Sequence, residues 1–145
     1  MNVSLVIPSY NAASTIGVLL ESIRNLDPSP LEVIVVDDCS TDNTVEIASG
    51  FEGVTCLSTP MNRGPSAARN LGARTACGEL LLFIDSDCVM LATDWIDRHV
   101  QVHRRHPACL LTGAVQSMTT DSITGRAAAY YEWHEMIPCH RDTEI

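Results

Sequence analysis

The sequence predicts an α/β domain whose open, parallel-rich sheet carries helices on both faces. Short apolar runs rich in β-branched residues alternate along the chain with segments whose apolar residues recur at helical spacing. Strands that alternate with helices favour βαβ units and therefore a parallel sheet. Polar or acidic residues also follow three of the apolar runs directly, at the positions where ligands collect in such folds.

The first half of the chain alternates between strands and helices. Residues 3–7 form an apolar run that Pro8 is expected to end, and Ser14 is the expected N-cap of the helix that follows. Prolines end this helix before a second strand at residues 31–36, which is dense in valine and isoleucine. The polar stretch 39–43 then caps a short helix.

The second half continues the same alternation. A third strand is expected at residues 54–57 and a helix of small residues at 65–76, with Gly78 as its C-terminal cap. Residues 80–84 are a continuous apolar run, so we expect a strand that is buried on both faces. The remaining expected elements are a helix from Thr93 or Asp94 to about His106, a strand at 108–115, a polar loop at 119–125 and a helix at 126–136.

The composition narrows the possible functions. A chain of 145 residues, 46% of them hydrophobic, can form one domain with a substantial core. Its net charge of -9 argues against nucleic acid as a partner, because nucleic acid requires basic patches. All nine cationic residues are arginine, which excludes a Walker-type phosphate loop because that loop needs lysine. Phosphate would have to be held by arginine, a metal ion or backbone N–H groups.

Cysteine and histidine give no strong signal of a metal site. The six cysteines include no C-x-x-C pair, and we expect most of them to be small core residues. His99, His103 and His106 share a helical face that we expect to be solvated. No secretion signal precedes the first strand and no apolar run approaches the roughly 20 residues of a membrane span. We therefore expect a cytoplasmic chain with reduced thiols, and any membrane association to be peripheral, at the inner face.

Three polar clusters that follow predicted strands form the candidate site. They are residues 8–11, the Asp37-Asp38 pair and Asp85-Ser86-Asp87. Because the carboxyl ends of parallel strands share one edge, we expect these clusters to line one crevice. The two carboxylates of an Asp-x-Asp motif repel each other unless a cation lies between them, and Mg²⁺ or Mn²⁺ carrying substrate phosphates is the usual solution. The motif is short, however, and aspartate is also common in ordinary turns.

The residue types suggest how a nucleotide would bind there. Tyr10 offers an aromatic face for a base, and Asp37 or Asp38 can accept a hydrogen bond from a base or a ribose hydroxyl. Arg69 lies near the start of its helix, within reach of a phosphate. Simpler interpretations stay open: Tyr10 packs within its loop, the aspartate pair favours a helix N-terminus, and Arg69 forms a surface salt bridge.

Four blocks of sequence carry a resemblance to a known family: VIPSYNAASTI, VVDDCSTDNT, NRGPSAARNLGARTACGELLLFIDSD and TGAV. In content, order and spacing they resemble the nucleotide-sugar-binding half of family 2 glycosyltransferases with the GT-A fold, a Rossmann-like α/β fold. The resemblance implies a single GT-A-like domain over residues 1–145. Its nucleotide-sugar-binding part would be residues 1–115, and residues 116–145 would begin an incomplete acceptor-side part.

The resemblance implies roles for the residues that match the family's motifs around the nucleobase. Pro8 and Tyr10 would hold the base, and Asp38 would bind its imide edge or the ribose. Asp37 would support the turn that carries Asp38. Arg69 would lie near the base or the diphosphate.

The resemblance also implies a metal site at the Asp-x-Asp motif. Asp85 would meet the ribose or the sugar and contribute to the metal site, and Asp87 would bind the divalent cation, Mg²⁺ or Mn²⁺. Many family members have another acid after this motif, whereas here that position is Cys88. A thiol is a poor ligand for either ion, so the metal would depend mainly on Asp87.

The implied function is the transfer of a sugar from a UDP-sugar or another nucleotide-diphosphate sugar to a hydroxyl group of a glycan, lipid or protein acceptor. The transfer would be inverting and metal-dependent. Family members carry an acidic general base, often in a Glu-Asp pair, but Glu132 and Glu135 lie in YYEWHEM without such a pair. No catalytic base is assigned. We expect the chain to end before its base, as a fragment or as the product of a truncated reading frame.

Two other classes of protein place acidic residues at similar positions. A receiver-type signalling module holds Mg²⁺ with an acidic pair and a further aspartate at strand ends, but it also needs a lysine after its last strand. A sugar nucleotidyltransferase would need a glycine-rich N-terminal loop with a lysine, whereas this chain has PSYNAAS. The absence of lysine counts against both alternatives.

Overall fold

The computed structural model describes residues 1–107, 109–110 and 137–138. The chain divides into two compact units, Met1–Val100 and Gln101–Ile145. In the part of the chain that is described, no helix is both long enough and apolar enough to cross a membrane. Three predicted segments lie wholly or mostly outside the described residues: the strand at 108–115, the loop at 119–125 and the helix at 126–136.

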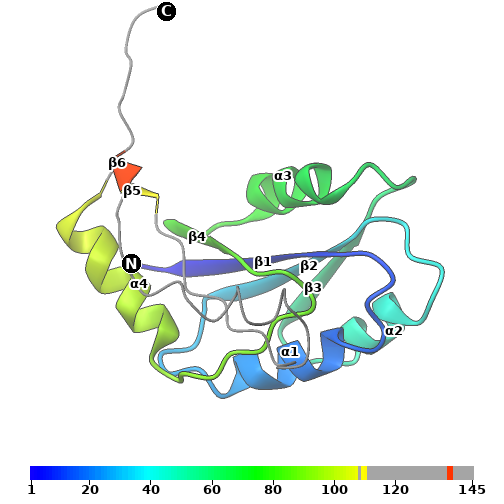
Figure 1. The fold of residues 1–145 in the computed structure, drawn as a ribbon, viewed down its shortest axis with the longest axis horizontal. Coiled ribbons are helices and arrows are strands. Elements are labelled where there is room, and N and C mark those ends of the chain that lie inside the picture. Colours follow the sequence, from blue (N-terminus) through cyan, green and yellow to red (C-terminus); the bar gives the residue numbers. More distant parts are fainter. Residues whose placement is uncertain (108, 111–136, 139–145) are drawn as a thin grey trace, which may run out of the picture. The chain divides into compact units, whose positions relative to one another are not determined.

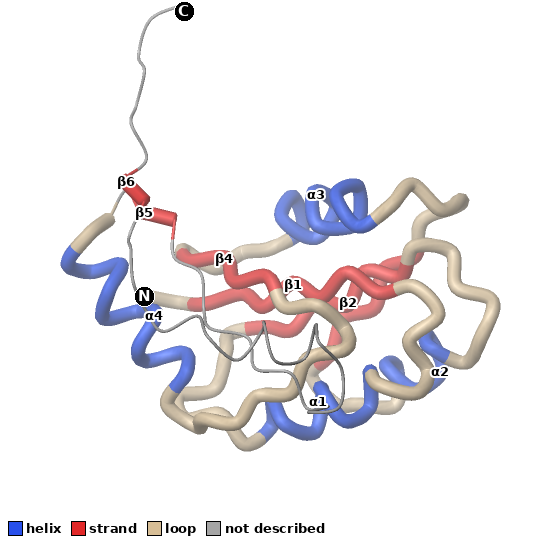
Figure 2. Tube along the Cα trace, viewed as in Figure 1, coloured by secondary structure: helices blue, strands red, loops and turns tan. Residues whose placement is uncertain are grey.

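The first unit is built on a four-stranded sheet (Figures 1 and 2). Its strands are β1 (Val3–Ser9), β2 (Glu32–Asp37), β3 (Val54–Ser58) and β4 (Leu80–Phe83). All neighbouring strands are parallel, and they lie in the order β3-β2-β1-β4. The predicted parallel sheet is therefore confirmed for the described residues, with the first strand in an interior position.

A helix follows each of these strands, namely α1 (Ile16–Arg24), α2 (Thr44–Ser49), α3 (Pro65–Thr75) and α4 (Trp95–Arg105). Figure 1 shows α1 and α2 on one face of the sheet and α3 on the other, as the sequence predicts. The N-cap of α1 is Thr15 rather than Ser14. In the second unit, the two-residue strands β5 (Cys109–Leu110) and β6 (Ile137–Pro138) pair antiparallel, and β5 lies within the strand predicted at 108–115.

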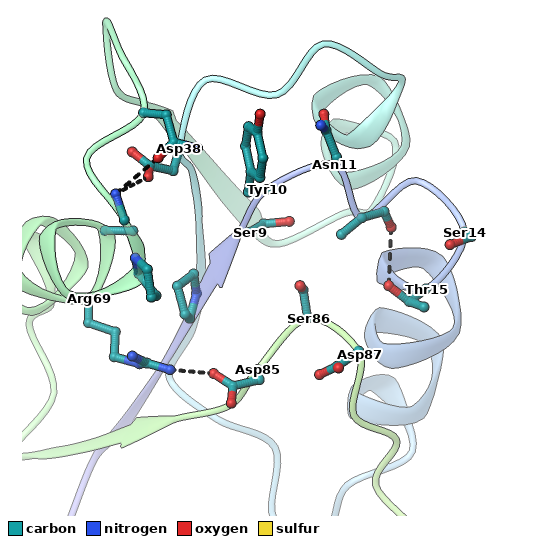
Figure 3. A pocket seen from close by; sticks show the side chains of 16 residues that line it. Ser9, Tyr10, Asn11, Ser14, Thr15, Asp38, Arg69, Asp85, Ser86 and Asp87 are labelled. Carbon is teal, nitrogen blue, oxygen red and sulfur yellow. Dashed lines mark hydrogen bonds and ion pairs between the residues drawn. The ribbon is translucent and has the colours of Figure 1, made fainter. Parts of the chain in front are cut away.

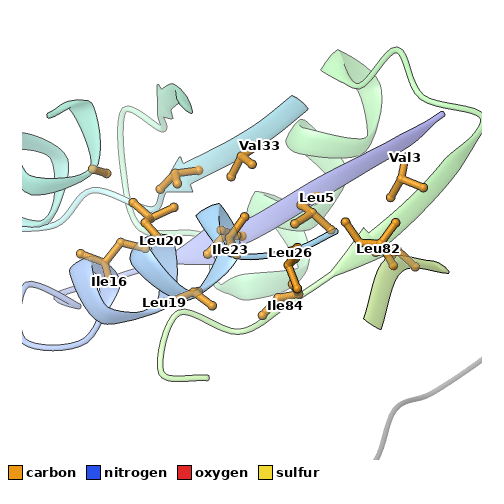
Figure 4. Packing of buried hydrophobic residues seen from close by; sticks show 14 of the residues in the cluster. Val3, Leu5, Ile16, Leu19, Leu20, Ile23, Leu26, Val33, Leu82 and Ile84 are labelled. Carbon is orange, nitrogen blue, oxygen red and sulfur yellow. The ribbon is translucent and has the colours of Figure 1, made fainter. Parts of the chain in front are cut away.

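Alternating side chains on the strands divide the core into two clusters. The larger cluster fills the face of the sheet that α1 covers (Figure 4) and contains, among others, Leu5, Val33, Leu82, Ile16, Leu20 and Ile23. The smaller cluster lies under α3 and consists of Val6, Ile34, Val36 and Ala68, with partly buried neighbours. The inner strands β1 and β2 contribute to both clusters, so they are anchored on both faces.

β1 continues through Pro8 to Ser9, whereas the sequence predicts that Pro8 ends it. Proline is rare in interior strands because it cannot donate a hydrogen bond to a neighbouring strand. In a parallel sheet, successive residues of an interior strand direct their backbone N–H and C=O groups alternately to the two neighbouring strands. The even-numbered residues of β1 face β4, because Val6 O accepts from Ile84 N. The β1–β4 register ends at the pair of Val6 and Phe83. Pro8 lies beyond the last β1–β4 pair, so β4 has no backbone acceptor there that would require an N–H from residue 8.

β4 is buried on only one face, so the prediction for residues 80–84 is wrong in this respect. Leu80, Leu82 and Ile84 pack in the larger cluster, but Phe83 is 45% exposed. Within the described residues β4 is an edge strand, and α3 packs mainly over β1 and β2. A continuous apolar run thus indicates a strand in the sheet without indicating that both of its faces are covered.

Two glycines allow chain segments to approach β1 closely. A Cβ atom on Gly72 of α3 would overlap Val6 Cγ1 and lie 3.2 Å from Val36 Cγ2. A Cβ atom on Gly78 would lie 2.7 Å from Ser4 N. α3 ends at Thr75 with Ala76 as its C-cap, so the predicted capping role of Gly78 is wrong. Its close approach to β1 explains why glycine occupies that position.

The expectation that the helical face with His99 is solvated is wrong, and the expectation that most cysteines are small core residues is met by two of the four that are described. His99 is 2% exposed, and its ring centroid lies 4.4 Å from that of Trp95, so this part of the helical face is not solvated. The helix turns this side toward the core because Ile96 and Val100 flank the histidine and are themselves buried. Four cysteine side chains are described. Cys39 and Cys77 are exposed, whereas Cys56 and Cys88 are partly buried and pack against the larger cluster.

A hydrogen-bonded network joins β1, β2 and the turn before β4 at the amino ends of the strands. Ser4 Oγ donates to Glu32 Oε1 at 2.6 Å, and the Cys77 N–H donates to the same oxygen at 2.6 Å. The Gly78 N–H donates to Ser4 Oγ at 2.8 Å. The hydrogen bond from Ser4, followed by that from Cys77, lowers the pKa of Glu32 below its ordinary value of 4.5 against the opposing effect of burial.

This network should make the stability of the fold sensitive to acid. Because the folded-state pKa of Glu32 is lowered, its contribution is complete above about pH 4.5 and is lost as the pH falls through the folded-state value. We expect Glu32→Gln to lower the free energy of unfolding at pH 7 by about 1 kcal/mol, a modest amount because the side chain is only half-buried and solvent screens its charge. Urea unfolding between pH 3 and 7 measures the effect.

The variant should also lose less stability than the wild type between pH 5 and pH 3. Glu52→Gln, in an exposed turn, is the matched control and should leave the urea midpoint at pH 7 unchanged. A Glu32→Gln protein with wild-type stability and the wild-type pH dependence would contradict the role of this network.

Candidate functional site

A pocket of about 550 Å³ lies at the carboxyl ends of the strands (Figure 3). Its walls come from the β1–α1 loop, the residue after β2, the start of α3 and the turn after β4. The structure thus brings together segments that are far apart in the sequence, as expected for strand ends that share an edge. Six of the seven predicted site residues line the pocket: Pro8, Tyr10, Asp38, Arg69, Asp85 and Asp87.

Hydrogen bonds join the β1–α1 loop to the β2–α2 loop on one side of the pocket. The Asn11 N–H donates to Ser40 Oγ at 2.8 Å, and Asn11 Oδ1 accepts from the Thr41 N–H at 2.9 Å. The Ala12 N–H donates to Thr44 Oγ1 at 2.8 Å, and the Ala13 N–H donates to Asp42 Oδ2 at 3.0 Å. Each loop therefore supplies the partners that the backbone of the other requires.

These hydrogen bonds hold Tyr10 in position. Asn11 adopts a φ of 48°, a left-handed conformation that asparagine tolerates better than most residues. The turn at Asn11 leads the chain away from β1, so Tyr10 stays at the rim with its side chain 50% exposed. An exposed ring beside a pocket can stack on a flat ligand, and here the backbone on which it stands is fixed before any ligand binds.

The Asp38 carboxylate is buried and is already occupied by protein donors. Thr59 Oγ1 donates to Oδ1 at 2.8 Å, and the Gly64 N–H donates to Oδ2 at 2.6 Å. The Arg63 N–H lies 3.0 Å from Oδ1 and 2.9 Å from Oδ2. Burial by itself raises the pKa of Asp38, but these hydrogen bonds outweigh it and hold the pKa below its ordinary value of 3.8. Asp38 therefore fixes the loop that leads into α3.

Asp37 differs from its neighbour, because the structure places it outside the lining of the pocket. Its Oδ2 accepts from the Ser40 N–H at 3.0 Å, which agrees with the implied role in supporting the turn. Its Oδ1 is buried and has no hydrogen-bond partner in the described part of the chain. The side chain continues the face of β2 that carries Val33 and Val35.

Arg69 and Asp85 form an ion pair across the pocket. Arg69 Nη2 lies 2.5 Å from Asp85 Oδ1, and the two side chains are 34% and 60% exposed. The α3 helix provides the arginine and the turn after β4 provides the aspartate (Figure 3). The salt bridge that the sequence left open is thus present, and it lies inside the pocket rather than on an outer surface.

Asp87, like Asp85, is an exposed carboxylate of the Asp-x-Asp motif, and none of the described hydrogen bonds or ion pairs engages it. The thiol of Cys88 next to it is half-buried, and burial together with the charges of Asp87 and Asp85 raises its pKa. Cys88 is therefore held in the protonated form that binds hard cations poorly. Among the described residues, no group of three or more histidine, cysteine, aspartate or glutamate side chains is placed to hold a metal ion.

Several polar residues of the pocket were not predicted as site residues. The lining also includes Ser9, Asn11, Ser14, Thr15, Asn62 and Ser86. Ser9, Asn11 and Ser86 lie within the predicted clusters, so their proximity to the site could be inferred. Asn62 precedes the helix start at Gly64 and Pro65, and a polar residue before a Gly-Pro helix start is the signal that could have identified it.

The pocket can be compared with known proteins. The profile that describes glycosyl transferase family 2 matches residues 4–141. The chain belongs to this family. The succinoglycan biosynthesis protein ExoO of Rhizobium meliloti is 31% identical to it over 137 residues, which are 93% of this chain and 38% of ExoO. The poly(ribitol-phosphate) beta-N-acetylglucosaminyltransferase TarS of Staphylococcus aureus is 38% identical over 93 residues, 60% of this chain and 16% of TarS.

Solved structures of glycosyltransferases agree with the fold. The crystal structure of S. aureus TarS 1-349 in complex with UDP-GlcNAc superposes with a TM-score of 0.69 and 31% identity, over 83% of this chain and 39% of that one. The mannosyltransferase PcManGT from Pyrobaculum calidifontis, in complex with GDP-Man and Mn2+, superposes with a TM-score of 0.72 and 29% identity, over 80% and 36%. The predicted GT-A fold is confirmed, and the family 2 matches favour neither the receiver module nor the nucleotidyltransferase.

The family 2 chain described here is shorter than its relatives. It spans 35% and 53% of two uncharacterized glycosyltransferases of Haemophilus influenzae, in addition to the smaller share of TarS given above. The family assignment applies to the chain, whereas the activity, substrates and partners of the whole protein belong to the proposal that follows.

Proposed function

We propose that this chain binds the nucleotide-diphosphate sugar donor of a glycosyltransferase in the pocket at the strand ends. The observation that carries the proposal is the convergence of an exposed ring, an arginine and two exposed carboxylates on one pocket: Tyr10, Arg69, Asp85 and Asp87. The solved relatives add support, since their crystals hold UDP-GlcNAc in one case and GDP-Man with Mn2+ in the other. We propose UDP or GDP as the nucleotide of the donor.

In this proposal the nucleobase lies at the end of the pocket formed by Pro8, Tyr10 and Asp38. Tyr10 stacks on the base, and its fixed backbone keeps the entropic cost of binding low. The Asp38 carboxylate is immobile because three protein donors already hold it. It acts as a rigid acceptor for one further N–H of the base or O–H of the ribose.

The diphosphate lies between Arg69 and the Asp-x-Asp motif. Arg69 transfers its hydrogen bonds from Asp85 to a phosphate, which leaves the Asp85 carboxylate for the ribose or the sugar. Asp87 suits a cation that keeps several waters and arrives with substrate phosphates, because such an ion needs only one or two protein carboxylates. When bound, Mg²⁺ or Mn²⁺ supplies Lewis-acid stabilisation of the departing diphosphate.

The reaction proposed for the whole protein is transfer of the sugar to a hydroxyl group of a glycan, lipid or protein. We propose an inverting, metal-dependent transfer, in which a carboxylate removes the proton of the acceptor hydroxyl. No residue is assigned as that base, and Glu132 and Glu135 lie outside the described residues. The division into parts at residue 115, the cytoplasmic location and the peripheral association with a membrane stay predictions.

Calorimetric titration with UDP and with GDP, each in the presence and absence of Mn²⁺, tests the donor site. We expect one nucleotide to bind more tightly with Mn²⁺. Asp87→Ala should weaken binding with Mn²⁺ by about tenfold or more, equivalent to about 1.4 kcal/mol, and should leave binding without Mn²⁺ nearly unchanged. The reason is that Asp87 contacts the cation rather than the nucleotide.

Glu79→Ala is the matched control, because Glu79 is an exposed carboxylate at the opposite end of β4. It should keep wild-type affinity under all conditions. Absence of nucleotide binding by the wild type would refute the donor site, and equal binding with Mn²⁺ by the wild type and Asp87→Ala would refute the metal role of Asp87.

A further inference from the structure

The cationic side chain of the pocket is already paired with a carboxylate. Arg69 is the only cationic residue among those that line the pocket, and its Nη2 lies 2.5 Å from Asp85 Oδ1. Such a short contact is a charge-assisted hydrogen bond. The lining also includes the carboxylates of Asp38 and Asp87. The free pocket therefore has more negative than positive charge, and its one guanidinium is engaged.

The ion pair is accessible enough for a ligand to separate its members. The side chains of Arg69 and Asp85 are 34% and 60% exposed, so water screens their attraction. They come from different segments, α3 and the turn after β4 (Figure 3), and no other described hydrogen bond holds either side chain in place. A ligand opens the pair if it binds the two groups more strongly than they bind each other.

A simple ion can satisfy only one member of the pair. Inorganic diphosphate could replace Asp85 on Arg69, but it would leave an unpaired carboxylate beside its own negative charge. A divalent cation could replace Arg69 on Asp85, but it would leave an unpaired guanidinium beside its own positive charge. In both cases a new repulsion between like charges offsets the new attraction.

A ligand that carries both kinds of group avoids this cost. Phosphate oxygens can take the hydrogen bonds of Arg69, while a hydroxyl group or a phosphate-bound cation takes the carboxylate of Asp85. A nucleoside diphosphate with its divalent cation offers all of these in one complex. Neither member of the ion pair is then left without a partner.

We propose that the Arg69–Asp85 ion pair is a latch, which closes the free pocket to simple inorganic ions and opens for a ligand that engages both residues. The identity of that ligand, a nucleoside diphosphate with its cation, rests on the proposed function. The latch itself requires only that the two side chains compete with ions for each other. It gives the pair a specificity role, the rejection of free phosphates and free metal ions.

Calorimetry on the full chain with inorganic diphosphate, in the absence of metal ions, tests the anion side of the latch. Asp85→Asn releases Arg69 and should bind diphosphate about fivefold more tightly than the wild type, which is equivalent to about 1 kcal/mol. The double variant Arg69→Gln/Asp85→Asn should show no gain, because the released arginine is what binds the anion. Removal of a repelling charge alone would produce a gain in both proteins.

Titration with Mn²⁺ alone tests the cation side. Arg69→Gln releases Asp85 and should bind Mn²⁺ about fivefold more tightly than the wild type. Both single variants should nevertheless bind UDP or GDP with Mn²⁺ more weakly than the wild type, because the complete ligand uses both residues. A gain of affinity for the simple ion together with a loss for the complete ligand is the signature of the latch.

The ion pair of Arg98 and Asp94 provides matched controls. Arg98 Nε lies 2.8 Å from Asp94 Oδ2, the two side chains are similarly exposed, and neither lines the pocket. Asp94→Asn releases an arginine and Arg98→Gln releases an aspartate, as the test variants do. Both controls should keep wild-type affinity for diphosphate and for Mn²⁺.

Two results would overturn the latch: single variants that bind the simple ions no more tightly than the wild type, or a double variant that keeps the gain for diphosphate. If the wild type still binds a nucleotide with Mn²⁺ in that case, the donor site stands without the latch. If the wild type binds no nucleotide, the proposed function fails, whereas a gain for diphosphate in Asp85→Asn alone would still support the latch.

Discussion

Asp38→Ala is expected to lower the free energy of unfolding by about 3–4 kcal/mol and to abolish measurable nucleotide binding. The substitution removes a buried carboxylate that accepts from Thr59 Oγ1 and from the N–H groups of Arg63 and Gly64. Those donors lose their partner, and the loop that leads into α3 loses its attachment to β2. Urea unfolding measures the stability, and calorimetry with the nucleotide measures the binding.

Asp42→Ala is the control that separates this effect from the general loss of a loop aspartate. Asp42 also accepts hydrogen bonds, from Thr44 N and Ala13 N, but it is exposed, so water can replace it. We expect a clearly smaller loss of stability than for Asp38→Ala. Equal losses in the two variants would contradict the view that the buried position of Asp38 makes it the more important residue.

Gly72→Ala is expected to lower the free energy of unfolding by about 2 kcal/mol. Alanine is favoured over glycine in a helix by about 1 kcal/mol, but an added methyl group in a packed interface costs about 1–3 kcal/mol. The upper part of that range applies because the new Cβ would overlap Val6 Cγ1 and lie 3.2 Å from Val36 Cγ2. Since Val6 is fully buried in an interior strand, it has little room to move.

Gly17→Ala provides a control with the opposite sign. Gly17 is also within a helix, but a Cβ atom there would lie 3.5 Å from Ile47 Cγ2, which is an ordinary contact. Helix propensity should therefore dominate, and the variant should gain about 0.5–1 kcal/mol. Urea midpoints that move in the same direction for both variants would show that contact with β1 does not determine the cost at Gly72.

The order and type of the described elements of the first unit could be predicted from sequence because they depend on local pattern. The apolar runs and the helical spacing predicted the first and last residues of each strand and helix to within a few positions. Two features depended on the surroundings of a residue instead. Pro8 is tolerated inside β1 because β4 is short, and Phe83 is exposed because α3 packs mainly over other strands. Neither fact is contained in the sequence near the residue concerned.

The location of the site was also predictable, whereas the task of each aspartate was not. Asp37 and Asp38 are adjacent and chemically identical, and the sequence alone left open which of them faces a ligand. The alternation of side chains along β2 separates them: Asp37 continues the face that carries Val33 and Val35, while Asp38 accepts a hydrogen bond from the loop before α3. The pairing of Arg69 with Asp85 likewise depends on how α3 lies relative to β4, which no local pattern reports.

The hydrogen bonds between the β1–α1 and β2–α2 loops constrain how the chain can change in length. Asn11, Ala12 and Ala13 each contact a residue of the other loop, so an inserted or deleted residue in either loop would shift every pairing that follows it. The two loops should therefore tolerate such changes only in combination. For anyone who wishes to introduce a tag or a reporter peptide, the exposed turn at Glu52 and Gly53 is a better place than either of these loops.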